Sequence, residues 1–201
     1  MNLLETMTDF YEVHKSKTKY LPLTYNIKIE WENQKSHLLK IKSIFSKIKS
    51  QNAESEMWVL KPGKNSNRGK NITIFKNIMD VQDFILEQEP GDQNWVVQKY
   101  IENPLLIGGP NWYNTPRRKF DIRVFGLAQI VKGTHLRGYV YQEGYIRTSS
   151  FEYSTSIKEI DNKFIHLTND AIQDKSSKYG KYESGNKISQ RDFQQFLKNE
   201  K

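Results

Sequence analysis

Cysteine is absent from the 201 residues, which excludes disulfides, thiolate metal sites and cysteine nucleophiles. The histidines show no metal-ligand spacing, which argues against a zinc site; they are His14, His37, His135 and His166. No apolar run approaches the length of a membrane span, and the start lacks a basic leader followed by an apolar core. These absences predict a soluble, intracellular protein with no membrane partner.

Several familiar catalytic and nucleotide motifs are also missing. The chain has no GxGxxG, GxSxG or HExxH, and Gly69-Lys70 is not a Walker loop because Asn71 follows it and the earlier glycine is absent. No RRM, KH or helix-turn-helix signature occurs, although aromatic and basic residues mix near Trp112 and Arg117. Nucleic-acid binding therefore remains a less favoured alternative.

The composition is that of a globular protein with a basic surface. Hydrophobic residues make up 36% and aromatic residues 12%, enough core material for one substantial domain or two small lobes. The net charge of +8 predicts attraction to polyanions such as a nucleotide, a nucleic acid or an acidic protein tail. Charge alone does not choose among these ligands.

The pattern predicts a mixed α+β chain. We expect a basic N-terminal region, residues 1–55, followed by a core over residues 56–201. Expected strands cover residues 21–27, 57–60, 72–75, 95–101, 119–131, 136–141 and 145–150. The first expected helix carries Leu38, Ile41, Phe45 and Ile48, and the second, begun near Asn77, carries Ile78, Val81 and Ile85. One or two helical turns are expected after residue 166. The last expected helix, capped by Ser189, carries Phe193, Phe196 and Leu197. Residues 103–118 are expected to form a loop.

The strand KFDIRVF is the chemical centre of the chain. Side chains alternate between the faces of a strand, so Phe120, Ile122 and Val124 are expected on an apolar face. Lys119, Asp121 and Arg123 would stand in one row on the other face, suited to a polyanionic or zwitterionic ligand. A half-exposed strand with a merely solvated charged row is the alternative.

The loop from Lys61 to Asn71 joins two expected strands and carries four cations with two glycines. Backbone amides and cations of such a loop can close over phosphates. A basic hairpin tip without a ligand explains the same residues equally well.

Six segments, taken in order, resemble the tubulin tyrosine ligase family from about Leu21 onward: WVLKPGKNSNRGKNITIF, WVVQKYIENPLLI, RRKFDIRVFGL, EGYIRTSS, HLTNDAIQ and YGKYESGN. The resemblance implies an ATP-grasp fold, in which two α+β lobes hold ATP and Mg²⁺. It also implies activation of a carboxylate as an acyl phosphate and its coupling to an amine. The implied partners are the tubulin C-terminal tail and a free amino acid (tyrosine, glutamate or glycine), and the implied location is cytoplasmic, on microtubules, in a cilium or at a basal body.

The resemblance also implies roles for individual residues. Nucleotide contacts would come from Lys61, Arg68, Gly69, Gln98, Lys99, the Ile101 backbone, Thr168 and Asn169. Catalytic roles would fall to Lys119, Asp121, Arg123 and Arg147, the last stabilising the transferring phosphoryl group. The physical reading agrees, because phosphoryl transfer requires fixed positive charge where negative charge develops.

Two departures from the family pattern matter. Relatives carry a later aspartate and a Glu-x-Asn that bind magnesium, whereas this sequence contains no Glu-x-Asn, so the expected fold has an incomplete metal site and the metal ligands are unknown. Asn71 also stands where many relatives have glycine, which predicts stiffer closure of the loop. A catalytically inactive module that binds acidic tubulin tails is the alternative function.

Overall fold

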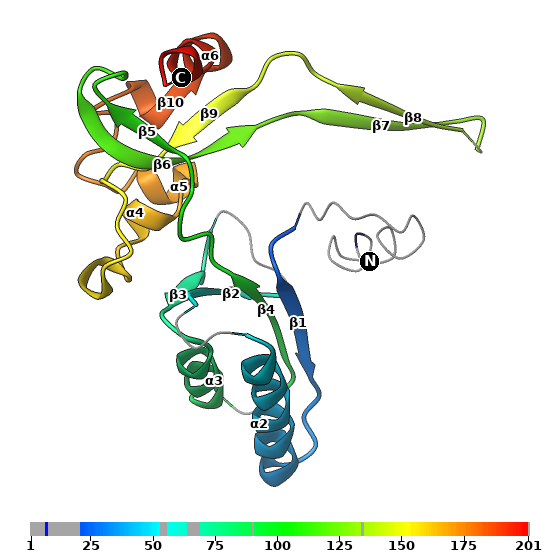
Figure 1. Ribbon diagram of the computed structural model, residues 1–201. Helices are drawn as coiled ribbons and strands as arrows, with labels where there is room; N and C mark the ends of the chain where they lie inside the picture. The colour runs from blue at the N-terminus through cyan, green and yellow to red at the C-terminus, as the bar shows by residue number, and fades with distance from the viewer. Residues whose placement is uncertain are drawn as a thin grey trace. The chain divides into compact units, whose positions relative to one another are not determined.

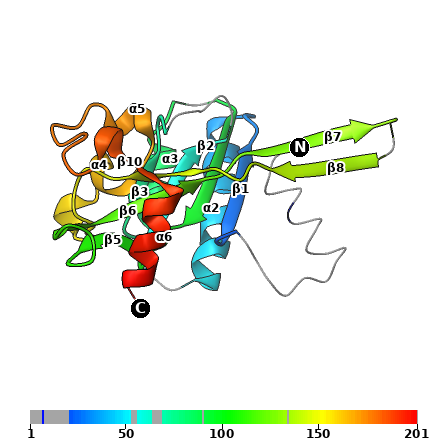
Figure 2. The ribbon, with the colours of Figure 1, turned by 90° about the horizontal axis from the view of Figure 1, so that it is seen from above.

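The structure is a computed structural model that describes residues 7, 21–52, 56–63, 69–89, 91–133 and 135–200. The chain forms two compact units, Met1–Asn103 and Pro104–Lys201. Both mix helices with antiparallel strands, which confirms the α+β class (Figures 1 and 2). The predicted division at residue 55 rests on composition and stays a prediction; by packing, the chain divides after Asn103.

The first unit is a four-stranded antiparallel sheet with two helices. Its elements are β1 (Thr24–Ile29), α2 (Gln34–Gln51), β2 (Trp58–Pro62), β3 (Thr73–Phe75), α3 (Ile78–Leu86) and β4 (Gln93–Lys99), with strand order β1-β4-β2-β3. The predicted β2–β3 hairpin is confirmed, since Trp58 pairs with Phe75. Figure 1 shows α2 and α3 on the same face of this sheet.

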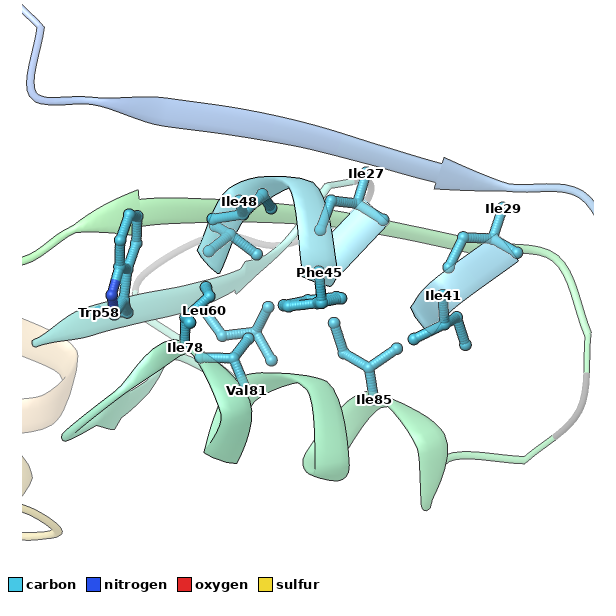
Figure 3. Packing of buried hydrophobic residues seen from close by; sticks show 11 residues of the cluster. Ile27, Ile29, Ile41, Phe45, Ile48, Trp58, Leu60, Ile78, Val81 and Ile85 are labelled. Atoms are coloured by element: carbon cyan, nitrogen blue, oxygen red, sulfur yellow. The ribbon is translucent and has the colours of Figure 1, made fainter. Parts of the chain in front are cut away.

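One apolar core holds the first unit together. Figure 3 shows side chains from α2 and α3 meeting between the helices and the sheet. Its buried members are Ile27, Ile29, Ile41, Phe45, Ile48, Trp58, Leu60, Ile78, Val81, Ile85 and Val97. The predicted stripe of α2 is confirmed except at its first position: Leu38 is exposed and His37 is buried instead. The stripe is offset because His37 and Ile41 stand four residues apart on the inner face.

The second unit contains a four-stranded sheet, a two-stranded ribbon and short helices. Its elements are β5 (Leu106–Gly109), β6 (Thr115–Arg123), β7 (Gly126–Val131), β8 (His135–Val140), β9 (Tyr145–Thr148), α4 (Lys163–His166), α5 (Asp170–Gln173), β10 (Lys187–Ser189) and α6 (Gln190–Asn199), with two single 3₁₀ turns, Ile157–Glu159 and Ser184–Asn186. The sheet order is β10-β9-β6-β5, and β7 pairs with β8.

The expected loop over residues 103–118 is wrong, because most of it forms the β5–β6 hairpin. Gly108 marks a close approach between the backbones of β5 and β6 rather than a loop. A Cβ on Gly108, whose φ is 135°, would lie 2.1 Å from the carbonyl oxygen of Pro116. Only glycine fits there, so the register shift between Ile107 and Gly109 can be accommodated.

The strand predicted over residues 119–131 is two strands, with β6 ending at Arg123 and β7 beginning at Gly126. Lys132 and Gly133 lie in the turn that follows β7, and both have a positive φ. Figures 1 and 2 show the β7–β8 ribbon extending away from the rest of the second unit. Almost every residue of the ribbon is exposed.

The capping predictions for the long helices are confirmed. The Asn77 side chain accepts hydrogen bonds from the backbone N–H groups of Met79 and Asp80 at the start of α3, both at 2.9 Å. Ser189 Oγ accepts from Asp192 N–H at 3.1 Å at the start of α6. These side chains satisfy amides that a first helical turn leaves unpaired.

Candidate functional site

The face of the first sheet opposite its helices carries polar residues beside Val59, Ile74 and Val96. By alternation and register, Thr24, Gln98 and Lys61 all lie on this face. Lys61 Nζ donates to Gln98 Oε1 at 2.7 Å, and Gln98 Nε2 donates to Thr24 Oγ1 at 2.8 Å. Lys61 and Gln98, both predicted to bind the nucleotide, are thus in contact, and Thr24 orients the Gln98 side-chain amide.

Lys61 is a cation in an unfavourable environment. Burial lowers the pKa of its ammonium group. Its hydrogen-bond partner within the described ranges is a neutral amide, not a carboxylate. An anionic ligand would supply the missing countercharge, so this residue fits the phosphates of a nucleotide.

Lys99 does not share the face of Lys61. It lies opposite Trp58 in the register, on the helix-bearing side of the sheet, and forms an ion pair with Glu56. The Ile101 side chain is 55% exposed just beyond β4. The structure separates the Lys99 side chain from Lys61 and Gln98, and the roles of Lys99 and Ile101 stay predictions.

The loop that was expected to cover phosphates is described only at its ends. Arg68 lies outside the described residues. Gly69 and Asn71 both have a positive φ, 79° and 55°. Asparagine tolerates this left-handed conformation better than most residues, so Asn71 can take the place of the glycine that relatives carry.

In the second unit the structure brings three predicted residues together. Asp121 on β6 pairs with Arg147 on the neighbouring strand β9. Arg147 Nε lies 3.0 Å and 3.1 Å from the two carboxylate oxygens, and its Nη2 lies 2.9 Å from Oδ2. Thr168 donates a hydrogen bond to the same Oδ2. Of the predicted charged row, Asp121 therefore belongs to an organised cluster with residues from two other segments.

The other predicted residues of this unit surround the cluster less closely. Lys119 is half-buried, and its charge acts with burial to lower the pKa of His166. Arg123 is exposed and stacks over the Phe125 ring, 5.5 Å from its centroid. Asn169 follows Thr168 and starts α5 without a side-chain cap. These positions border the face of Asp121, and their roles remain predictions.

The apolar face of β6 is only partly as predicted. Phe120 packs on the core formed with α6, with its ring 4.9 Å from that of Phe193. Ile122 and Val124 are 56% and 57% exposed, so this end of the predicted apolar face is not covered. The core beside α6 includes Phe120 and Ile146, the partner of Ile122 on β9, but not Ile122 or Val124.

Sequence reasoning missed Arg118, which lies on this apolar face and is fully buried. Its Nη1 and Nη2 donate to the Glu183 carboxylate at 2.9 Å and 2.5 Å. Trp112 Nε1 and Thr148 Oγ1 each donate to the same carboxylate at 2.9 Å. Burial alone would raise the pKa of Glu183, but the Arg118 guanidinium outweighs it and holds the pKa below its ordinary value.

A second missed pair flanks the Asp121 cluster. Lys187 on β10 stands opposite Arg147, and its Nζ lies 3.2 Å from Asp170 Oδ2. Tyr179 donates to the other Asp170 oxygen at 2.9 Å. The bond to Asp170 raises the pKa of Lys187, which keeps it charged. Strand alternation could have placed Arg118 on its face, but the partners Glu183 and Asp170 lie outside the strands and are brought in only by the tertiary fold.

Two negative findings apply to the described part of the chain. No group of three histidine, aspartate or glutamate residues there could hold a metal ion. Nor is any helix there long and apolar enough to cross a membrane.

Comparison with known proteins gives the family. The model of the tubulin-tyrosine ligase family matches residues 4–201. This chain belongs to the tubulin-tyrosine ligase family. It is 38% identical over 147 residues to "Tubulin glycylase 3D" of Tetrahymena thermophila, covering 72% of this chain. It is 36% identical over 135 residues to "Probable alpha-tubulin polyglutamylase Ttll1" of the same organism, covering 64% of this chain.

The chain matches only a small part of these curated relatives, 13% of the glycylase and 30% of the polyglutamylase. Among solved structures it is similar to the C-terminal domain of K. lactis Pby1, described as an ATP-grasp enzyme that interacts with the mRNA decapping enzyme Dcp2. That likeness has a TM-score of 0.46 and 24% identity, covering 85% of this chain and 47% of that one. The family membership rests on the family model and the curated relatives rather than on this likeness.

Proposed function

We propose that this chain is the nucleotide-holding and carboxylate-positioning part of an ATP-dependent ligase that adds an amino acid to a tubulin C-terminal tail. Family membership supports the reaction class. The observation that carries the proposal is the cluster of Asp121, Arg147 and Thr168, three residues from distant segments that meet on one sheet face. When bound, ATP would supply the phosphoryl group that activates a carboxylate as an acyl phosphate for attack by an amine.

Arg147 is suited to stabilise the transferring group. Asp121 holds it through Nε and Nη2, and Thr168 in turn fixes Asp121. The remaining nitrogen, Nη1, has no acceptor among the described residues, so it can donate to a phosphoryl or carboxylate oxygen. A guanidinium fixed in advance stabilises developing negative charge without reorganising during the reaction.

In the first unit, Lys61 and Gln98 fit a nucleotide. The half-buried Lys61 ammonium would gain a phosphate countercharge, and the Gln98 amide could exchange its present bonds for those of a base. Arg68, Gly69, Lys99, Ile101 and Asn169 complete the proposed nucleotide contacts, and Lys119 with Arg123 the proposed substrate contacts.

Magnesium is implied by the use of ATP, but the described residues do not fit a complete site for it. Asp121 is a carboxylate near the proposed chemistry, yet it already binds Arg147 and Thr168. Mg²⁺ requires several oxygen ligands in near-octahedral geometry. We therefore assign no step of the reaction to a metal held by these residues.

A binding module for acidic tails is the second candidate. The net charge of +8 favours it, since complementary charge speeds encounter with an acidic segment. Incubation with ATP, magnesium, tubulin and each labelled amino acid separates the two functions. Label on intact tubulin, and none on tubulin stripped of its C-terminal tails, supports the ligase. Binding that requires the tails, without incorporation, supports the module.

The nucleotide assignment is tested by Lys61→Ala, measured by ATP binding with isothermal calorimetry. Loss of a half-buried cation proposed to contact phosphates should weaken ATP binding about 10-fold or more. Lys198→Ala, which removes an exposed lysine of α6, serves as the control and should leave affinity unchanged. Equal effects of the two changes would overturn the assignment of Lys61.

A further inference from the structure

Three charged residues form a row across three neighbouring strands of the second unit, β10, β9 and β6 (Figure 1). Lys187 on β10 pairs in register with Arg147 on β9, and Arg147 pairs with Asp121 on β6. Residues that pair across strands lie on one face of the sheet, so Lys187 shares the face of Asp121 and Arg147. As strand alternation requires, its neighbour Ile188 lies in the apolar core on the other face. The row therefore extends the proposed ligase site by one strand.

A carboxylate and a hydroxyl group hold Lys187 in place. Its Nζ lies 3.2 Å from Asp170 Oδ2, and the Tyr179 hydroxyl donates to Asp170 Oδ1 at 2.9 Å. The Asp121 cluster has the same order of groups, since Thr168 donates to the carboxylate that binds the arginine. One short segment joins the two arrangements, because Thr168 and Asp170 are only two residues apart. The two cations are thus positioned by equivalent sets of groups.

Both cations keep donors that a ligand can use. A lysine ammonium has three N–H groups, and within the described residues Asp170 is the one acceptor for Lys187. The Lys187 side chain is 42% exposed, so its other donors are accessible. Arg147 likewise keeps Nη1, and no described carboxylate bonds to both cations. Paired residues on neighbouring strands have Cβ atoms about 4.5–5.5 Å apart. The row therefore fits a ligand that carries two anionic groups a short distance apart.

We propose that Lys187 binds a second carboxylate of the acidic acceptor, next to the carboxylate that Arg147 positions for activation. This inference rests on the proposed ligase function, which brings the first carboxylate to Arg147. In an extended peptide, side chains two residues apart point to the same side, about 6–7 Å from each other. Two glutamates with this spacing can reach both cations, so Lys187 makes the site select acceptors with two carboxylates. Nucleotide phosphates carry similar anionic oxygens, and ATP affinity distinguishes the two ligands.

The selectivity is measured by fluorescence polarisation with the full chain and three labelled peptides. The first is Gly-Ser-Glu-Ser-Glu-Ser-Gly, and each of the others has one glutamate replaced by glutamine. The unaltered chain should bind the first peptide about 10-fold more tightly than either analogue, because two charge-assisted bonds form instead of one. Lys187→Met should bind all three peptides alike. Lys187→Arg keeps the charge and should retain the preference.

The matched control is Lys198→Met, which makes the same charge change at an exposed position of α6 and should keep the preference. Urea unfolding of Lys187→Met should match that of the unaltered chain, because an exposed ion pair contributes little to stability. ATP affinity of Lys187→Met, measured by calorimetry, should also be unchanged.

Four results would overturn the proposal: no preference in the unaltered chain, a preference that survives Lys187→Met, an equal loss in Lys198→Met, or a loss of ATP affinity in Lys187→Met. Incorporation of labelled amino acid into tubulin, measured on the same preparations, reports on the ligase function separately. A preference that depends on Lys187, without any incorporation, would contradict the ligase function and leave the carboxylate site in place.

Discussion

Strand β6 contributes to two ion pairs that stand three residues apart on opposite faces of one sheet. Arg118 and Glu183 are buried, with side chains 0% and 7% exposed. Asp121 and Arg147 lie on the other face, 32% and 22% exposed. Every nitrogen of the Arg118 guanidinium has an acceptor. Arg147 keeps one nitrogen unused within the described residues.

The difference separates a structural pair from one that a ligand can reach. A charge in the interior loses its hydration, so the buried pair persists only because additional hydrogen bonds satisfy both partners. The half-buried Asp121–Arg147 pair loses less hydration and contributes less to stability, and its guanidinium remains accessible. The sequence segment YGKYESGN, which supplies Glu183, therefore serves the structure of this unit.

The largest expected effect comes from removing one partner of the buried pair. Arg118→Met leaves the Glu183 carboxylate buried and unpaired, and should destabilise the fold by about 3–5 kcal/mol in urea unfolding. The double change Arg118→Met with Glu183→Leu should recover much of this loss, because no charge is then left buried. If Arg118→Met lowers the free energy of unfolding no more than Asp121→Asn does, the two ion pairs do not differ in their contribution to stability.

The second prediction concerns the half-buried pair. Asp121→Asn keeps the shape of the side chain but weakens its hold on Arg147, and should reduce ligation about 100-fold through misplacement of the guanidinium. Its cost in unfolding free energy should stay below about 1 kcal/mol. Rates of amino-acid incorporation and urea unfolding, measured on the same preparation, test both statements. Full activity of Asp121→Asn would remove Asp121 from the proposed site.

The third prediction is a pH dependence of stability. The folded pKa of Glu183 is lowered, so its contribution is fully present above the ordinary glutamate pKa of about 4.3 and is lost as pH falls through the lower folded value. Urea unfolding between about pH 7 and pH 3 should therefore show less acid sensitivity in Glu183→Gln than in the unaltered chain. Identical slopes would show that this carboxylate does not govern acid unfolding.

The smallest expected effect concerns α6, the helix that packs against Phe120 on the same sheet face as Arg118. Ser189→Ala removes the N-cap of α6 and should cost about 1 kcal/mol of unfolding free energy. Gln194→Ala, an exposed change on the same helix, is the control and should be nearly neutral. A cost at Gln194 as large as that at Ser189 would exclude capping as the cause.

Local patterns predicted the elements whose signals are short in range. The periodicity of Ile41, Phe45 and Ile48 predicted α2, and the capping residues Asn77 and Ser189 located the starts of α3 and α6. Glycine was less informative, because Gly108 marks a close approach between the paired strands β5 and β6 and was predicted to lie in a loop. A single glycine permits both structures, and only the strand beside it decides between them.

The sequence by itself determined the family, the α+β composition and the alternation that sets Asp121 apart from Phe120. Those features depend on residue order and on periods of two or 3.6 residues. Tertiary structure alone decided that Arg147 meets Asp121, that Glu183 meets Arg118, and that the side chains of Lys61 and Lys99 part to opposite faces. It also decided the exposure of Ile122 and Val124. The pairing of strands that are distant in sequence, and the part of the sheet that α6 covers, depend on how segments pack against each other. A local sequence pattern carries no information about such packing.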